Sequence, residues 1–228
     1  MKRLSVSVAV ALGVLAAAPG LRADGTCAAE PSKSLASSLL RQAPGLKADV
    51  LRLALHATGC AAEQGLVKRR DLLTVIDYSL PSSQPRLFVF DLAARKLLFR
   101  ELVAHGRNSG GDIASFFSNS PGSLATSLGL FVTADKYVGS NGYSLRLKGL
   151  EEGINDMAMD RAIVMHGAAY VSKAAIHSLG RLGRSWGCPA VRKEVARRMI
   201  DTLRGGSPIF AYYPDHRWLK QSEFVAAR

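Results

Sequence analysis

The sequence contains little that would support nucleotide, metal or nucleic-acid chemistry. It has no internal repeat, no glycine-rich phosphate loop, no dinucleotide-binding glycine fingerprint and no His, Cys and carboxylate spacing typical of a metal site. Aromatic residues make up 7% of the chain, and Lys and Arg are scattered rather than interleaved with aromatic side chains. We therefore expect no metal, no cofactor and no nucleic-acid partner.

Acidic residues are also few. The chain has 18 Asp and Glu against 30 Lys and Arg, a formal net charge of +12. Such a surface attracts anionic partners, for example wall polymers or membrane surfaces, although a merely solvated basic surface explains the charge about as well.

A long apolar run occurs at the start of the chain. Residues 1–3 carry two positive charges, residues 4–18 are apolar, and Pro19 follows, which is the pattern of a secretory signal. We expect a signal peptide over residues 1–20, with cleavage as late as residue 23 as the alternative. The run is short for a bilayer span, so the mature protein is expected to be exported, periplasmic and without a stable membrane span.

The three cysteines are Cys27, Cys60 and Cys188. An odd number in an oxidising compartment favours pairing of two and a separate task for the third. A Cys27–Cys60 bridge would leave Cys188 free, although Cys27 lies close to the cleavage site.

The apolar patterns predict an α+β fold, mainly β with flanking helices. We expect an N-terminal helical segment over residues 21–70, a strand-rich domain over 71–214 and a C-terminal tail or helix over 215–228. Strands are expected at 72–78, 87–92, 97–104, 127–133, near 163 and at 208–213, with a hairpin over 136–147.

Cys188 lies in the stretch Gly-Arg-Ser-Trp-Gly-Cys-Pro-Ala-Val. Apolar residues at every fourth position from Val191 predict a helix over 192–203, with Cys188 at its N-cap and Pro189 at its first position. A helix N-terminus favours a thiolate, so Cys188 is a candidate nucleophile. A small buried hydrophobic residue is the alternative interpretation.

A base for this thiol is available in His166, which ends a short apolar run and precedes Gly167 as a strand end does. A single histidine at a strand end is more commonly structural, but a Cys and His pair is the signature of acyl transfer through a thioester. For His105 and His177 we favour structural or exposed positions, and for His56 a packed or surface position.

With His166 and Gly167 followed 22 positions later by Cys188 in Ser-x-Gly-Cys, the chain resembles the murein L,D-transpeptidase catalytic domain family of the YkuD-like superfamily. It is most similar to the branch with a Ser-x-Gly-Cys-Pro-Ala-Val motif. The resemblance runs in order from about Leu73 to Tyr212, through the blocks Ile-Asp-Tyr-Ser, Val-Ala-His-Gly, Ser-Pro-Gly and Tyr-Ser-Leu-Arg-Leu.

The resemblance implies a β-rich catalytic domain with Cys188 as nucleophile, His166 as general base and the Gly167 carbonyl orienting the imidazole. Such enzymes attack the L,D bond of a peptidoglycan stem tetrapeptide, release D-alanine and pass the acyl group to an amine or to water. The chain departs from the commoner motif at Trp186, where that motif has histidine, and at Ala190, where it has a polar residue.

The remaining site residues are inferred from these roles. The N–H groups of Gly187 and Cys188 are candidates for an oxyanion hole, and Ser185 and Arg184 would shape the loop or hold a substrate carboxylate. Three functions stay open: a transpeptidase with an amine or protein acceptor, a carboxypeptidase or cross-link-cleaving hydrolase with the same site, and a peptidoglycan-binding module without turnover.

Overall fold

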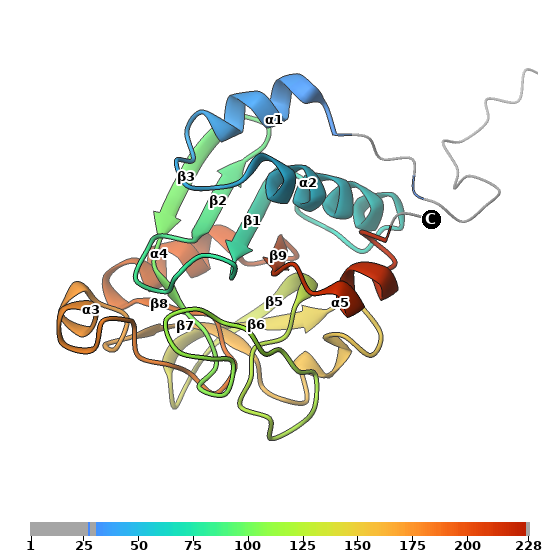
Figure 1. Cartoon of the computed structure of the whole chain (residues 1–228). Coiled ribbons are helices and arrows are strands. Elements are labelled where there is room, and N and C mark those ends of the chain that lie inside the picture. The colour runs from blue at the N-terminus through green and yellow to red at the C-terminus, as the bar shows by residue number, and fades with distance from the viewer. Residues whose placement is uncertain (1–26, 28–30, 227–228) are drawn as a thin grey trace, which may run out of the picture.

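The computed structural model describes Cys27 and residues 31–226 (Figure 1). The predicted signal segment, whether it ends at residue 20 or 23, lies outside the described residues. Within them, strands join into a sheet of nine in the order β3-β2-β1-β9-β5-β6-β7-β8-β4, with helices at its sides. The predicted α+β fold, mainly β with flanking helices, is confirmed.

Two helices precede the sheet, as the sequence predicts. They are α1 (Lys33–Leu40) and α2 (Ala48–Glu63), and both lie over the β1 to β3 side in Figure 1. The Ser32 side chain caps α1 by accepting a hydrogen bond from the Leu35 N–H. Cys27 is bonded to Cys60 of α2 with an S–S distance of 2.08 Å, so the pairing that the sequence left open is formed and Cys188 is the free cysteine.

The first three strands lie close to the predicted ranges and pair as an antiparallel meander. They are β1 (Leu72–Asp77), β2 (Leu87–Asp91) and β3 (Lys96–Glu101). β1 also pairs in parallel with β9 (Pro208–Tyr212), so the last strand of the chain lies in the middle of the sheet. Every residue of β1 is buried, as expected for a strand covered on both faces.

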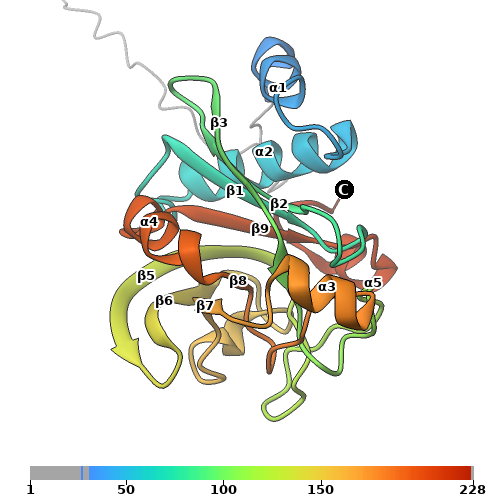
Figure 2. The same ribbon diagram turned by 90° about the vertical axis from the view of Figure 1, so that its left-hand side faces the viewer.

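The middle of the sheet is the hairpin of β5 (Gly129–Gly139) and β6 (Gly142–Gly149), which turns at Ser-Asn-Gly within the range of the predicted hairpin. In Figure 2 these two strands curl beneath the rest of the sheet. Three short strands continue from β6: β7 (Val164–Ala168), β8 (Ala190–Arg192) and β4 (Val103–Ala104). This end of the sheet carries the candidate site.

The remaining helical elements are η1 (Asp156–Ala158), α3 (Lys173–Leu179), α4 (Lys193–Leu203) and α5 (His216–Gln221). α4 packs against β7, and its buried stripe contains Val195, Met199 and Leu203, as the four-residue repeat predicts. Trp218 of α5 donates its indole N–H to the buried Glu151 carboxylate at 3.0 Å, which fastens the C-terminal helix to the sheet.

None of the helices in the described part of the chain is long and apolar enough to cross a bilayer. The division of the chain at residues 70 and 214 stays a prediction.

Candidate active site

Cys188 does not cap a helix, so that prediction is wrong. Ala190–Arg192 form strand β8, and α4 begins at Lys193 with Arg192 as its N-cap residue. Val191 is buried because it lies in the sheet, but in sequence it extends the apolar stripe of α4 by one step. The partial charge at the N-terminus of α4 therefore gives no account of thiol activation.

The Cys188 thiol is enclosed by the segment that leads into β7. Its Sγ accepts a hydrogen bond from the Val164 N–H at 3.4 Å and donates to the Ala162 carbonyl at 3.7 Å. The residue is 8% exposed. Burial raises the pKa of the Cys188 thiol, while the Val164 N–H and the nearby Arg161 act in the opposite direction. The resting group is therefore a neutral thiol.

His166 lies in β7, next to the strand that follows Cys188. In the parallel pairing of β7 and β8 it stands opposite Ala190, two residues after the cysteine. Its Nδ1 is 3.3 Å from the Gly167 carbonyl oxygen, which can only accept, so Nδ1 carries the proton and Nε2 presents a lone pair. Burial lowers the pKa of His166, which keeps the ring neutral and able to accept a proton.

No hydrogen bond joins the imidazole of His166 to the thiol of Cys188 in this structure; the thiol bonds to Ala162 and Val164, and the ring to Gly167. Catalytic hydrogen bonds are commonly loose in enzymes without substrate and tighten when it binds. His166 lies on β7 and Cys188 lies two residues before the adjacent β8, and the two groups form a neutral pair rather than a preformed ion pair.

The loop before Cys188 is organised by Ser185. Its hydroxyl donates to the Cys188 carbonyl at 2.6 Å and accepts from the Gly187 N–H at 3.1 Å. The Gly187 N–H is therefore already engaged, which leaves the Cys188 N–H as the oxyanion donor of the predicted pair. Gly187 has φ of +119°, and a Cβ there would lie 2.7 Å from the Ala125 carbonyl oxygen, so only glycine fits.

Arg184 and Trp186 flank the same loop. The Arg184 guanidinium donates to the Gly110 carbonyl at 2.8 Å and the Arg107 carbonyl at 3.2 Å, so here it shapes the loop. Trp186 is 73% exposed, which places an open aromatic face two residues before Cys188.

His105 is a buried structural residue, as favoured from the sequence. Its Nδ1 accepts a hydrogen bond from Arg86 at 2.7 Å, and Arg86 also donates to the Val103 and Leu80 carbonyls. Burial, followed by the charge of Arg86, lowers the pKa of His105 to about 4. His177 is exposed on α3, and His56 lies 3.5 Å from the Cys60 sulfur.

Two arginines near the site were not predicted from the sequence. Arg86 is fully buried in front of His105, and Arg161 lies beside Gly187 and Cys188. Both are single members of a set of 30 Lys and Arg residues, and neither belongs to a recognisable motif. Only the fold shows which of them face the interior.

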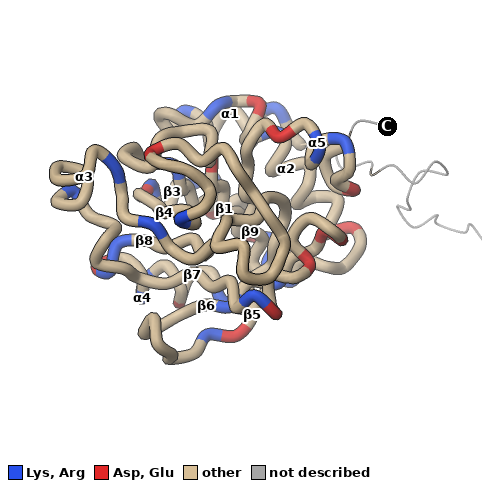
Figure 3. The backbone as a smooth tube through the Cα atoms, turned by 60° about the horizontal axis from the view of Figure 1, so that its bottom comes forward, with Lys and Arg blue, Asp and Glu red and all other residues tan. Residues whose placement is uncertain are grey.

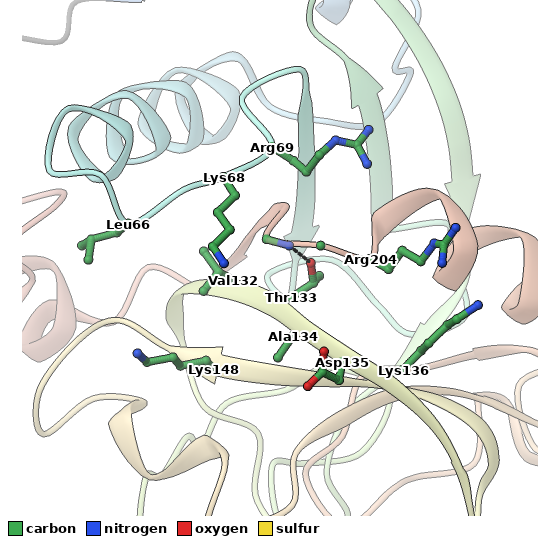
Figure 4. Close-up of a pocket in the computed structure, with 12 residues that line it drawn as sticks. Leu66, Lys68, Arg69, Val132, Thr133, Ala134, Asp135, Lys136, Lys148 and Arg204 are labelled. Carbon is green, nitrogen blue, oxygen red and sulfur yellow. Dashed lines mark hydrogen bonds between the residues drawn. The ribbon is translucent and has the colours of Figure 1, made fainter.

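A separate surface cleft lies away from these residues. It has a volume of about 990 Å³ and includes neither Cys188 nor His166 among its lining residues. Five cations line it, and we call this group the basic cleft: Lys68, Arg69, Lys136, Lys148 and Arg204. Figure 4 shows their side chains around the hollow, with the acidic Asp135 among them. Figure 3 shows Lys and Arg on most other elements too.

The described residues contain one group with the spacing of a metal site, Cys27, His56 and Cys60. Because the two thiols are joined as a disulfide, they are not available as thiolate ligands. This group therefore does not fit a metal in the oxidised protein.

Comparison with protein families matches residues 42–212 to the L,D-transpeptidase catalytic domain. Among solved structures, the chain is similar to an L,D-transpeptidase from Mycobacterium smegmatis, with 15% identity, 63% of this chain and 59% of that chain covered, and a TM-score of 0.40. An L,D-transpeptidase from Stackebrandtia nassauensis gives 11% identity, 79% and 76% coverage, and a TM-score of 0.38.

The helical cell shape determining protein Pgp2 from Campylobacter jejuni gives 11% identity, 63% and 48% coverage, and a TM-score of 0.43. The match covers about three fifths of the length of the mycobacterial enzyme. A comparison with curated proteins gave no significant match.

Proposed function

The chain belongs to the L,D-transpeptidase catalytic domain family, and from that membership we propose that it is an exported, periplasmic cysteine acyltransferase acting on peptidoglycan stem peptides. The observation that carries the proposal is the placement of Cys188 and His166. Both are buried beside the β7 and β8 pair, with Nδ1 of His166 fixed by the Gly167 carbonyl. This arrangement matches the nucleophile and base that acyl transfer requires.

The proposed reaction begins with proton transfer from the Cys188 thiol to Nε2 of His166. The thiolate attacks the carbonyl carbon of the L,D bond, and the Cys188 N–H donates to the developing oxyanion. The intermediate collapses to a thioester, and the amine of D-alanine leaves with the proton from the imidazolium. An acceptor amine then attacks the thioester, gives its proton to His166, and the thiol is restored.

The neutral state of both groups supports this sequence of steps. Burial holds the pKa of the thiol up and that of the imidazole down, so neither bears charge before the substrate arrives. The base is therefore active once the pH exceeds the lowered pKa of His166, and the acid limb of the rate should lie below pH 6.5, the ordinary histidine value.

The same site also supports hydrolysis, in which water takes the place of the acceptor amine. The difference depends on whether the exposed surface around Trp186 binds an acceptor peptide or leaves the thioester to water. Product analysis decides between them, because tripeptide is the product of hydrolysis and a cross-linked dimer that of transfer.

The experiment is to incubate the mature protein and its Cys188→Ala variant with a purified disaccharide tetrapeptide, and to measure D-alanine and the product masses. Release from the wild type alone supports the proposal, and the ratio of dimer to tripeptide assigns the acceptor. Equal release from both proteins, or none from either, contradicts it.

The basic cleft favours an additional contact with the wall. Lys68 and Lys148 come from different parts of the chain and line it together, so a carboxylate-bearing polymer such as peptidoglycan fits its charge. If the protein is a binding module, Cys188→Ala sediments with purified sacculi as wild type does while neither releases D-alanine. Loss of sedimentation in the Lys68→Glu and Lys148→Glu double variant would assign that contact to the basic cleft.

A further inference from the structure

Arg161 is a partly buried cation held by neutral groups. It lies in the connection between η1 and β7, and its guanidinium donates four hydrogen bonds. The acceptors are the Ser118 carbonyl at 2.7 Å, the Ser127 hydroxyl at 2.5 Å, the Ala125 carbonyl at 2.6 Å and the Ser123 hydroxyl at 3.1 Å. All four belong to the segment 118–127, which contacts the cysteine loop where the Thr126 hydroxyl donates to the Gly187 carbonyl at 3.3 Å.

No carboxylate within the described residues forms an ion pair with Arg161. Burial lowers the pKa of this arginine, and Cys188 is the group that acts on it in the opposite direction. A cation removed from water without a counter-ion is costly, and proteins normally supply an anion at such a position. For Arg161 the nearby group that can become an anion is the thiol.

The geometry places the guanidinium against the nucleophile loop. A Cβ built on Gly187 would lie 3.2 Å from Nη2 of Arg161, and Gly187 is bonded directly to Cys188. Ala162, the residue after the arginine, supplies the carbonyl to which the thiol donates. Arg161 is therefore close to Cys188 in two ways. Its guanidinium lies against Gly187, and the residue after it accepts the hydrogen bond of the thiol.

We infer that Arg161 is a positioning residue whose guanidinium provides the counter-charge for the Cys188 thiolate. The inference rests on the proposed function in taking Cys188 as the nucleophile. When His166 takes the thiol proton, the negative charge left on sulfur forms beside a cation that is already fixed in place. Trp186 stands where the commoner motif has a histidine, and it carries no charge. Arg161 supplies a positive charge beside this loop.

A purely structural role for Arg161 predicts the opposite result from an electrostatic one. If the side chain only fastens segment 118–127, removing it loosens the packing of that segment against the cysteine loop and admits water. Better solvation lowers the pKa of the thiol or leaves it unchanged. If the guanidinium acts on the thiolate, removing its charge raises the pKa of the thiol.

The test is the pH dependence of Cys188 alkylation by iodoacetamide in the full mature chain. The reaction reports one thiol, because the chain has three cysteines and Cys27 and Cys60 are bridged under non-reducing conditions. The titratable or charged groups near the thiol are Arg161, His166, Tyr78 and Tyr170. The two tyrosines have raised pKa values and stay neutral over pH 5 to 10.

We expect the alkylation midpoint to rise by about one pH unit in Arg161→Met, the lower end of the shift that a neighbouring opposite charge produces. The rate at pH 7 should fall only about threefold, because a more basic thiolate is also more nucleophilic. Arg161→Lys keeps the charge and should stay near the wild-type midpoint, although it cannot make the same four hydrogen bonds.

Arg217→Met is the matched control, since it removes one arginine charge from an exposed position on helix α5. Circular dichroism and the thermal midpoint establish folding, and Arg161→Gln, whose amide can still donate to segment 118–127, replaces Arg161→Met if that variant does not fold. An unchanged or lower midpoint in a folded neutral variant would overturn the inference, as would a Lys variant that behaves like Met. Because alkylation needs no substrate, this result is independent of whether D-alanine is released.

Discussion

Two histidines at one end of the sheet are each followed by a glycine, and their surroundings differ. His105 and Gly106 follow β4, His166 and Gly167 lie in β7, and β8 pairs with both strands. Both histidines are buried, at 1% and 5% exposure. The difference lies in which ring nitrogen meets a neighbour and in what that neighbour is.

At His105 the neighbour is a cation. Arg86 can only donate, so the lone pair of His105 Nδ1 accepts a hydrogen bond from the guanidinium. Burial and the charge of Arg86 lower the pKa of the ring, which therefore stays neutral. At His166 the neighbour is the Gly167 carbonyl, which accepts from Nδ1 and leaves the Nε2 lone pair available. One partner makes a histidine a structural acceptor, and the other leaves the ring able to serve as the base of the proposed reaction.

The largest expected effect separates the two histidines by activity. His166→Gln should lower the rate of D-alanine release by about 10²- to 10⁴-fold, the usual contribution of a general base, while the free energy of unfolding changes by less than about 1 kcal/mol. His105→Gln, in which the amide oxygen can still accept from Arg86, should retain most of the activity. Release assays and urea unfolding measure both quantities, and similar activity losses in the two variants would contradict the assignment.

Removing the Arg86 guanidinium, which donates to His105, should lower the free energy of unfolding rather than the rate of the reaction. Arg86→Met leaves three buried acceptors without their donor, the carbonyls of Leu80 and Val103 and Nδ1 of His105. At about 1 to 3 kcal/mol for each of the three unsatisfied groups, we expect a loss of about 3 to 9 kcal/mol in urea unfolding. Arg100→Met, at an exposed arginine of β3, should cost less than about 1 kcal/mol. A comparable loss of unfolding free energy in the two variants would show that the buried hydrogen bonds of Arg86 stabilise the fold no more than an exposed arginine does.

The pH dependence of stability should also distinguish the two sites. The pKa of His105 is about 4 in the folded protein against an ordinary 6.5, so between these values the unfolded chain binds more protons. The free energy of unfolding should therefore be highest above pH 6.5 and fall by about 3 kcal/mol as the pH decreases to 4. His105→Gln should remove most of this slope. His166→Gln should remove less, and a slope unchanged by His105→Gln would refute the explanation.

Much of the fold was predictable because its signals are local. The meander of β1 to β3, the β5–β6 hairpin at Ser-Asn-Gly and the stripe of α4 each follow from residue patterns within one segment. The insertion of β9 beside β1 was not predictable in this way, since a parallel pairing between distant segments leaves no local pattern.

The candidate site was predictable where a motif carries it and not where packing does. Cys188, His166 and Gly167 lie in the blocks that carry the family resemblance, and His166 and Gly167 lie on β7, which pairs with the strand that begins two residues after Cys188. The prediction that Cys188 is a helix N-cap was wrong because β8, which precedes α4, continues the apolar spacing of that helix in the sequence. Arg161 acquires its place from segment 118–127, nearly 40 residues earlier, and no local pattern marks it.

The smallest expected effect concerns the glycine after each histidine. A Cβ on Gly106 would lie 2.5 Å from the Leu124 carbonyl oxygen, a backbone atom, whereas one on Gly167 would lie 2.9 Å from the Cβ of Ala196 on α4. Overpacking costs about 1 to 3 kcal/mol, and it should be larger for Gly106→Ala, because segment 118–127 would have to move, than for Gly167→Ala, where a helix can shift slightly. Urea unfolding measures the two costs.

Activity should follow the reverse order, since displacing the Gly167 carbonyl turns the His166 ring and lowers D-alanine release, while Gly106→Ala leaves that contact in place. Equal activity in the two variants would mean that the Gly167 carbonyl does not orient the base.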